Sequence, residues 1–500
     1  MLNDIVKTSK HTFVYALGNV ATKAIGIILI PLYTDPKFIT QTDFGELAIL
    51  EATAQILTGI FAMAMTSSIQ RWYWDNAYSK EQKSIFFSSL AFLVALNIPV
   101  LTLFTFNAGW LSQVIFHSVD YSYLLKLTFA TVGIRILNNQ IKTVIKLRSK
   151  PGLFSLAEIV KLTLTLLLTI FFVVKRSKGL DGIWEATLIG ELIAFILMLR
   201  FTIRNIVLRI NTLILKEMLT YGYPLMLSAA SAVILSTTDR FMIHFLVGPQ
   251  ETALYSLGFR FANTLQLVLS VSVMSALTPL RMKKINEPDN HRFYAKTLTY
   301  VSYVFIFCLM ILSLFSLEAI KIITKSTNYW DANGIIPILS YAFMFTLMRQ
   351  NLNIGLVIRK KTKRVALLVF ATTILNFGLN ALFVPLWDIY GASLATLLSQ
   401  MIFCVLMFWQ SQKVYPIKYE LNKLSIMVIV SAAIVVTALV ISPLDVWIRI
   451  PVKLGLLGVF PFILYLFNFY EPRELEIIKQ IMKTWYNPMK IGENIRRLLN

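Results

Sequence analysis

Long runs of apolar residues recur along the whole chain, and they restrict its possible folds more than any other feature. A helix rises about 1.5 Å per residue, so about 20 apolar residues span the hydrocarbon core of a bilayer. The runs at residues 162–174, 365–384 and 426–441 contain no charged residue, and 57% of all 500 residues are hydrophobic. The sequence therefore predicts an all-α integral membrane protein.

The apolar runs divide into fourteen expected membrane helices. These cover approximately residues 10–33, 44–70, 84–106, 121–145, 153–174, 182–203, 217–246, 253–280, 297–315, 335–358, 365–384, 391–412, 425–442 and 452–468. With the N-terminus inside, the inside segments carry 32 Lys and Arg residues and the outside loops carry 8. This bias predicts cytoplasmic N- and C-termini. It also accounts for the net charge of +21, so nucleic acid is not an expected partner.

Seven basic residues remain inside the apolar segments. They are Lys23, Lys126, Arg135, Lys161, Arg240, Arg260 and Arg349. A Lys or Arg at the centre of a membrane helix costs roughly 2.5–3.5 kcal/mol on insertion scales, so seven in lipid would cost on the order of 20 kcal/mol. Most of them must therefore face a shared interior, a carboxylate or an aqueous edge. An interior lined by cations is suited to binding an anion.

An internal repeat divides the chain. Gly182–Leu188 recurs as Gly391–Leu397 at a shift of 209 residues, and Thr42–Ala48 corresponds to Glu251–Ser256 at a shift of 208. The shift spans six expected helices, an even number, so the two halves have the same orientation and are related by a pseudo-twofold axis along the membrane normal. Transporters built from such repeats bind substrate between the halves, near the middle of the membrane.

The repeat predicts four regions. Residues 1–212 form an N-lobe of helices 1–6, and residues 213–422 form a C-lobe of helices 7–12. Residues 423–468 add two helices without a counterpart, and residues 469–500 form a cytoplasmic tail. The apolar residues of the tail recur at helical spacing, namely Leu475, Ile478, Met482 and Trp485. This spacing predicts an amphipathic helix that lies on the inner membrane surface.

Two of the seven basic residues are the strongest candidates for binding an anion. Lys23 shares a polar stripe with Asn19 in the first expected helix, and Arg260 shares one with Asn263 in the eighth. No acidic residue lies within one turn of Arg260, which is therefore expected to be unpaired. A guanidinium suits phosphate because its fork forms two parallel hydrogen bonds. For Lys23, a hydrogen bond to a neighbouring helix is the alternative.

The other charged positions have more modest expected roles. Arg135 and Arg349 are secondary candidates for substrate binding, one in each lobe. The carboxylates of Asp239, Glu51 and Glu191 are weak candidates for coupling transport to protons or sodium ions.

Three of the basic residues have simpler structural explanations. Arg240 adjoins Asp239 and is expected to take part in a structural ion pair. Lys161 follows Glu158 by three residues and is expected to neutralise it. Lys126 lies near the outer end of its helix, where its side chain reaches the interface.

Signatures of an enzyme are absent from the sequence. It contains no P-loop and no Gly-x-Ser-x-Gly motif, and its four histidines lack the spacing of metal ligands. The longest outside loop, about residues 316–334, is too short for a catalytic domain. We therefore expect a transporter without a cofactor, driven by a proton or sodium gradient, the membrane potential or the substrate gradient.

Several short motifs occur in an order that is known from one family. They are Gly18–Asn19 with Leu29–Thr34, then Thr42–Ala48, Arg71–Tyr73, Asp239–Phe241, Ala253–Ser256 and Tyr390–Thr396. In these motifs the chain resembles the polysaccharide-biosynthesis flippases of the multidrug/oligosaccharidyl-lipid/polysaccharide (MOP) exporter superfamily, the group that contains the O-antigen translocases. Ala253 departs from the glycine that is usual at its position.

The resemblance implies a fold, a substrate and a location. Two six-helix lobes would form a V around a central cavity and alternate in access. The substrate would be an undecaprenyl-pyrophosphate-linked oligosaccharide, moved from the inner to the outer leaflet of the bacterial cytoplasmic membrane. Related peptidoglycan-precursor flippases keep basic residues in the first and eighth helices, which Lys23 and Arg260 match, and use helices 13 and 14 to border a lipid-tail groove. Glycosyltransferases and a glycan polymerase would be neighbouring partners.

Three other functions remain as alternatives. A peptidoglycan-precursor flippase would share the same architecture and the same basic positions. A drug or cation antiporter of the multidrug and toxin extrusion (MATE) type would need a cavity dominated by carboxylates, whereas the central positions here are mostly basic. A membrane glycan polymerase would need a long outside loop with catalytic residues, and the sequence has none.

Overall fold

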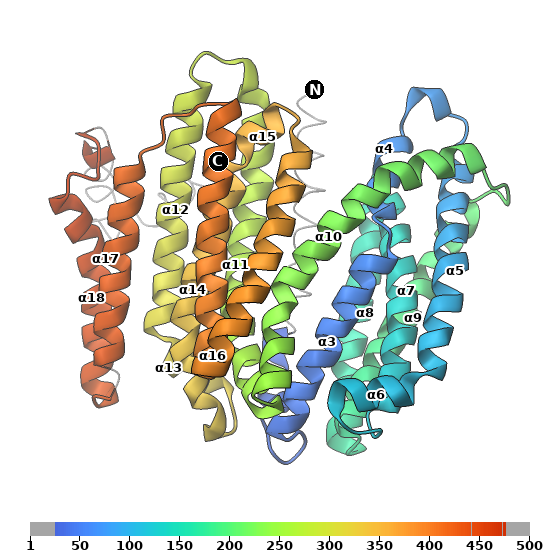
Figure 1. The fold of residues 1–500 in the computed structure, drawn as a ribbon, viewed down its shortest axis with the longest axis horizontal. Helices are drawn as coiled ribbons and strands as arrows, with labels where there is room; N and C mark the ends of the chain where they lie inside the picture. Colours follow the sequence, from blue (N-terminus) through green and yellow to red (C-terminus); the bar gives the residue numbers. More distant parts are fainter. Residues whose placement is uncertain (1–25, 442, 473, 477–500) are drawn as a thin grey trace, which may run out of the picture.

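The computed structural model describes residues 26–441, 443–472 and 474–476, and helices joined by turns and loops make up this part of the chain (Figure 1). The first lobe contains α2 (Ile30–Tyr33), α3 (Gln41–Phe61), α4 (Met65–Trp72), α5 (Gln82–Phe106), α6 (Ala108–Phe116), α7 (Ser122–Leu147), α8 (Pro151–Ile170) and α9 (Gly179–Arg204). The second contains α10 (Thr212–Leu246), α11 (Pro249–Lys283), α12 (Asn290–Leu314), α13 (Ser316–Ile323), α14 (Ile335–Leu352), α15 (Ile354–Ile358) and α16 (Thr362–Val414). Two further helices follow, α17 (Leu421–Val440) and α18 (Val446–Leu466).

The helices agree in position with the expected membrane segments from the second onward, whereas most of the first segment lies outside the described residues. By length and composition, ten helical segments of the described part are able to cross a membrane. The ten do not include α7 and α11, each of which carries several basic residues. The protein is therefore a multi-span membrane protein with an all-helical fold, and the count of fourteen stays a prediction.

Glycines of the repeated motif have the same role in both halves. The backbone of α16 departs from helical angles at Trp387 and Asp388. This element therefore consists of two helical segments joined by a sharp turn. A Cβ on Gly391 would lie 2.1 Å from the carbonyl oxygen of Phe383. A Cβ on Gly182, at the start of α9, would lie 2.7 Å from the Cβ of Phe172. Both close approaches exclude a side chain, which explains the glycine in each copy of the motif.

The two lobes meet at one end of the molecule. Their ribbons converge where α3 begins and separate towards the end where α4 and α15 lie (Figure 1). At the converging end the Gln41 side chain donates to the carbonyl oxygen of Gln250 at 3.3 Å, and the amide of Lys325 donates to Thr34 Oγ1 at 3.1 Å. A Cβ on Gly45 would lie 1.9 Å from the carbonyl oxygen of Pro249, so this glycine lets α3 and α11 pack in backbone contact.

Helix α10 joins the lobes and packs on both of them. Its first turns pack on α4, where Ser68 Oγ donates to the Met218 carbonyl at 2.8 Å and Trp72 Nε1 donates to Glu217 at 2.9 Å. Pro224 lies inside the helix, and the turns beyond it pack along α3 and α16. The boundary that the repeat places at residue 213 thus falls at the start of a helix that contacts both lobes.

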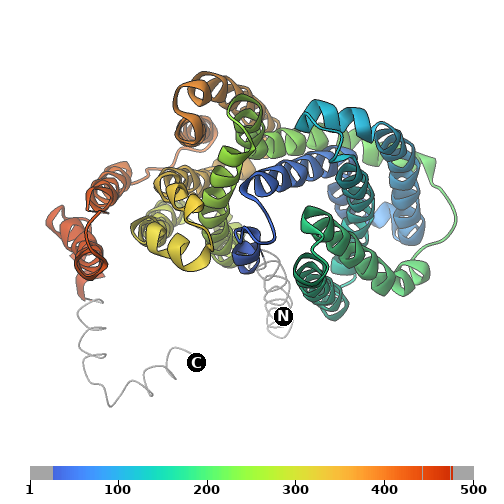
Figure 2. The same ribbon diagram turned by 90° about the horizontal axis from the view of Figure 1, so that it is seen from below.

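Helices α17 and α18 lie at the edge of the C-lobe, far from the N-lobe (Figures 1 and 2). Helix α17 packs on α12, and α18 is tied to α13 by Glu318, which lies 2.7 Å from Arg449 Nε and 2.8 Å from Lys453 Nζ. Burial raises the pKa of Glu318, but its hydrogen bond to Lys453 and the two positive charges outweigh burial and hold the pKa below its usual value.

The sequence counts Arg449 and Lys453 among the outside charges, just before and at the start of the helix expected at about residues 452–468, and the structure corrects this. Both lie in the first turns of α18, which begins at Val446 rather than near residue 452, and both are buried. The expected amphipathic tail helix lies almost entirely outside the described residues.

Candidate substrate-binding site between the lobes

An ion pair joins the two lobes between α3 and α11. Arg260 Nη2 of α11 lies 2.7 Å from Glu51 Oε2 of α3. The two residues are 209 positions apart, as are Gln41 and Gln250, which form another contact between the lobes. The repeat gives a shift of 208 for α3 and α11 and of 209 for the motif of α9 and α16, so both contacts join positions that are equivalent to within one residue. Such positions approach each other near a pseudo-twofold axis, which therefore passes close to Arg260.

The expectation that Arg260 is unpaired is wrong, because its partner comes from the other lobe. Its guanidinium also lies over the rings of Tyr33 and Phe44, 5.7 and 5.3 Å from their centroids. The Arg260 side chain is 16% exposed and that of Glu51 is 36% exposed. The aromatic rings orient the guanidinium, whereas the carboxylate of Glu51 is partly accessible.

Asp239 in α10 is buried and accepts three hydrogen bonds. The hydroxyls of Tyr255 and Thr396 each donate at 2.6 Å, and the Asn380 amide donates at 2.8 Å. These donors come from α11 and from both segments of α16. The carboxylate is therefore surrounded by neutral oxygen- and nitrogen-bearing side chains, and it fixes the packing of three helices.

The structural ion pair expected for Arg240 is absent from the described residues. The buried guanidinium of Arg240 lies instead over the ring of Phe259, 4.4 Å from its centroid, and its Nε has no hydrogen-bond partner. Adjacent residues of a helix point in different directions, which explains why Arg240 does not pair with its neighbour Asp239.

The N-lobe contains a buried network of three cations and two carboxylates between α7, α8 and α9. Glu191 lies 3.1 Å from Arg135 and 3.7 Å from Lys161, and Glu158 lies 3.2 Å from Lys161 and 2.8 Å from Lys142. The Asn138 amide also donates to Glu191 at 2.9 Å. The expected pairing of Lys161 with Glu158 is therefore confirmed, and Arg135 is held within its own lobe.

The remaining predicted residues are placed as follows. Arg349 lies over the ring of Phe403, 4.0 Å from its centroid, with its Nε buried and without a hydrogen bond. Asn263 is half-buried on α11, three residues after Arg260. Lys23 and Asn19 lie outside the described residues. Of the predicted residues, the structure brings Arg260 and Glu51 into contact, whereas the contacts of Arg135 and Arg349 lie within their own lobes.

One contact between the lobes has no signal in the sequence. His244 Nδ1 of α10 lies 3.8 Å from Glu46 Oε2 of α3, and both side chains are buried. His244 Nε2 is also 2.9 Å from the Ile115 carbonyl oxygen. The two residues are not related by the repeat shift, so only the packing of α10 against α3 reveals this pair. The aromatic partners of Arg260 were likewise hidden among apolar residues of the sequence.

Comparison with known protein families gives two matches. The profile of a family described as polysaccharide biosynthesis protein matches residues 9–286, and that of the MatE family matches residues 224–382. A comparison with curated proteins finds no match.

Solved structures with the same fold include a lipid flippase and multidrug transporters. The lipid II flippase MurJ in an inward closed conformation has a TM-score of 0.73 at 15% identity and covers 91% of this chain and 99% of its own. An inward-facing multidrug resistance MATE family transporter has a TM-score of 0.66 at 15% identity, with 79% and 94% covered. An outward-facing structure of a MATE family transporter has a TM-score of 0.59 at 14% identity, with 81% and 95% covered.

The family match and the fold lead to one assignment. The matched residues 9–286 make up more than half of the 500 residues. The chain belongs to the polysaccharide biosynthesis protein family and has the fold of the MOP transporter superfamily.

Proposed function

We propose that this protein is a flippase that moves an undecaprenyl-pyrophosphate-linked oligosaccharide from the inner to the outer leaflet of the bacterial cytoplasmic membrane. The observation that carries this proposal is the position of Arg260, a cation between the lobes whose only carboxylate partner among the described residues is half-exposed. A pyrophosphate headgroup cannot cross hydrocarbon unaided, because the transfer of its charge out of water is too costly.

The cross-lobe pair supports a mechanism of ligand exchange. Without substrate, Glu51 neutralises Arg260 and allows the cation to stay between the lobes. A pyrophosphate oxygen then replaces the carboxylate and gains bidentate hydrogen bonds from the guanidinium. Because Arg260 and Glu51 belong to different lobes, this exchange removes an ion pair that holds the lobes together when substrate binds. The lobes are then free to open to the other side.

The other predicted residues have supporting roles in this proposal. Lys23 would be the second pyrophosphate ligand, with Asn19 and Asn263 as hydrogen-bond partners of the headgroup. Arg135 and Arg349 would act as secondary cations on the path. Glycosyltransferases would supply the substrate and a polymerase would consume it.

Asp239 is the best placed of the three carboxylates for ion coupling. It is buried and surrounded by neutral donors, whereas Glu51 and Glu191 are each paired with basic residues. A proton or a sodium ion bound there would change the packing of α10, α11 and α16. This carboxylate and the match to the MatE family also support the alternative of a cation-coupled drug antiporter.

A transport assay separates these functions. Purified protein in proteoliposomes is given a fluorescent undecaprenyl-pyrophosphate oligosaccharide, a neutral polyprenyl glycoside with the same sugar, or ethidium. We expect the pyrophosphate lipid to reach the opposite leaflet at least about tenfold faster than the neutral lipid, since only the former binds Arg260. Ethidium transport without flipping of the pyrophosphate lipid would establish the antiporter instead.

A further inference from the structure

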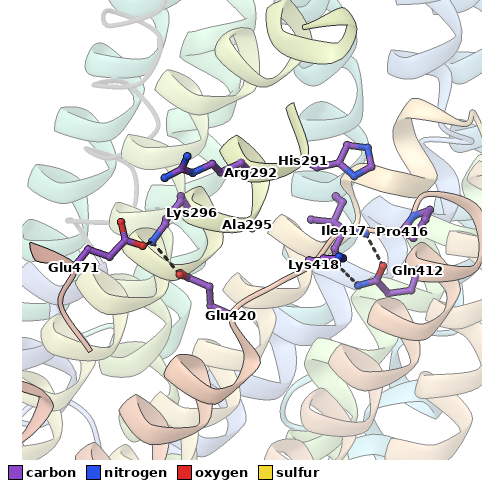
Figure 3. A pocket seen from close by; sticks show the side chains of 10 residues that line it. All are labelled: His291, Arg292, Ala295, Lys296, Gln412, Pro416, Ile417, Lys418, Glu420 and Glu471. Atoms are coloured by element: carbon purple, nitrogen blue, oxygen red, sulfur yellow. Dashed lines mark hydrogen bonds and ion pairs between the residues drawn. The ribbon is translucent and has the colours of Figure 1, made fainter. Parts of the chain in front are cut away.

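A pocket lined by charged and polar side chains lies on the side of the C-lobe that faces α17 (Figure 3). It has a volume of about 720 Å³ and lies apart from the contact between the lobes. Its lining comes from the first two turns of α12, from the end of α16, from the connection before α17 and from the residue Glu471 that follows α18. The pocket therefore forms where the additional helices join the C-lobe.

The carboxylates in this pocket are already neutralised. Lys296 Nζ lies 2.9 Å from Glu420 and also bonds Glu471, so one ammonium group holds both acids (Figure 3). Glu420 additionally lies 3.4 Å from Lys423 and accepts a hydrogen bond from the Thr299 hydroxyl at 2.7 Å. These contacts fix the wall of the pocket and remove most of its negative charge.

Two basic side chains of the lining have no such partner. Arg292 and Lys418 are exposed, and neither forms an ion pair with any residue that the structure describes. They come from α12 and from the connection before α17, so they line the pocket from two different segments. The pocket thus has an excess of positive charge after its acids are paired.

Two helix N-termini add to this charge. Helices α12 and α17 both begin beside the pocket, and no side chain caps the first turn of either helix. The free N–H groups and the dipole of a helix place roughly half a positive charge at its N-terminus. Uncapped N-termini with adjacent basic side chains are suited to binding phosphate groups.

We propose that this pocket binds an anionic, phosphate-bearing headgroup. Both α12 and α17 are candidate membrane spans, and the pocket lies at their N-terminal ends, where lipid headgroups are found. Its volume exceeds that of a single phosphate ion and accommodates a complete headgroup. The proposal is independent of the substrate that the site between the lobes carries. The same chemistry would also admit a soluble pyrophosphate compound, which the experiment distinguishes.

Native mass spectrometry of the full chain in detergent tests this site. The probes are phosphatidylglycerol, phosphatidylcholine and sodium pyrophosphate. We expect the wild type to bind phosphatidylglycerol more tightly than phosphatidylcholine. The double variant Arg292→Gln/Lys418→Gln should bind phosphatidylglycerol about 30-fold more weakly than the wild type, because it lacks two positive charges near the anionic headgroup. The charge-preserving variant Arg292→Lys/Lys418→Arg should bind within about threefold of the wild type.

The control is Lys361→Gln/Lys363→Gln, which removes the same charge from exposed positions at the start of α16. Equal phosphatidylglycerol binding by the control and the pocket variant would overturn the proposal. Pyrophosphate binding that depends on Arg292 and Lys418, without phosphatidylglycerol binding, would identify the source of the phosphate as soluble. All variants are first compared with the wild type by gel filtration and thermal unfolding, so that a folding defect is recognised.

Discussion

Replacing Arg260 with Ala is expected to lower the rate of lipid flipping about 100-fold, because a charge-assisted, bidentate hydrogen bond to phosphate contributes roughly 3 kcal/mol. Arg260→Lys should restore part of the rate, since an ammonium keeps the charge and loses the fork. The rate is measured in proteoliposomes that contain the fluorescent pyrophosphate lipid. Arg204→Ala, at the exposed end of α9, is the matched control and should retain the wild-type rate.

This prediction separates substrate binding from a purely structural role of the ion pair. If Arg260 served only to tie the lobes together through Glu51, then Glu51→Ala would impair flipping as much as Arg260→Ala. In the exchange mechanism the two variants differ, because only the arginine contacts the substrate. Flipping by Arg260→Ala at the wild-type rate would rule out Arg260 as a ligand of the headgroup.

Replacing Glu191 with Ala is expected to destabilise the protein by about 3 kcal/mol, because it removes a buried carboxylate and leaves the half-buried Arg135 without its partner. Lys161 keeps Glu158 as an ion-pair partner, so Arg135 is the residue that loses its only carboxylate among the described residues. The measurement is the thermal unfolding of purified protein in detergent. Glu191→Gln should be less harmful, since its amide oxygen still accepts the hydrogen bond from Asn138.

Glu185 provides the control on the same helix. Its carboxylate lies 2.6 Å from Lys178, whose side chain is 42% exposed, and a solvent-exposed pair contributes about 1 kcal/mol or less. Glu185→Ala should therefore change stability little. If both substitutions lowered the unfolding temperature equally, the N-lobe network would not have the structural role that its burial indicates.

The fold was largely predictable because hydrophobic length and charge bias are local signals. Apolar runs located the helices from the second segment onward, and the repeat located the two halves. The packing of α10 on both lobes was not predictable, because it depends on side chains such as Trp72 and Glu217 that are far apart in the sequence. The start of α18 was missed because Arg449 and Lys453 resemble loop residues until Glu318 is known to neutralise them.

The candidate site was predictable in part. Arg260 was found from its polar stripe and from the cost of an intramembrane cation, and Glu51 was found only as a weak coupling candidate. Their contact was hidden because they are 209 residues apart. The repeat contained the missing signal, since its shift of 208 to 209 residues placed them within one residue of equivalent positions, and such positions approach each other near the axis. The repeat gave no such signal for Glu46 and His244, because these two residues do not lie at equivalent positions of the two halves.

Substrate binding by three proteins tests the central claim most directly. The affinity of an undecaprenyl-pyrophosphate oligosaccharide is measured for the wild type, Glu51→Gln and Arg260→Gln in the same detergent. The account predicts that Glu51→Gln binds about tenfold more tightly, because the competing carboxylate is gone, and that Arg260→Gln binds at least about tenfold more weakly. Equal affinity of all three proteins would contradict the claim that the headgroup replaces Glu51 on Arg260.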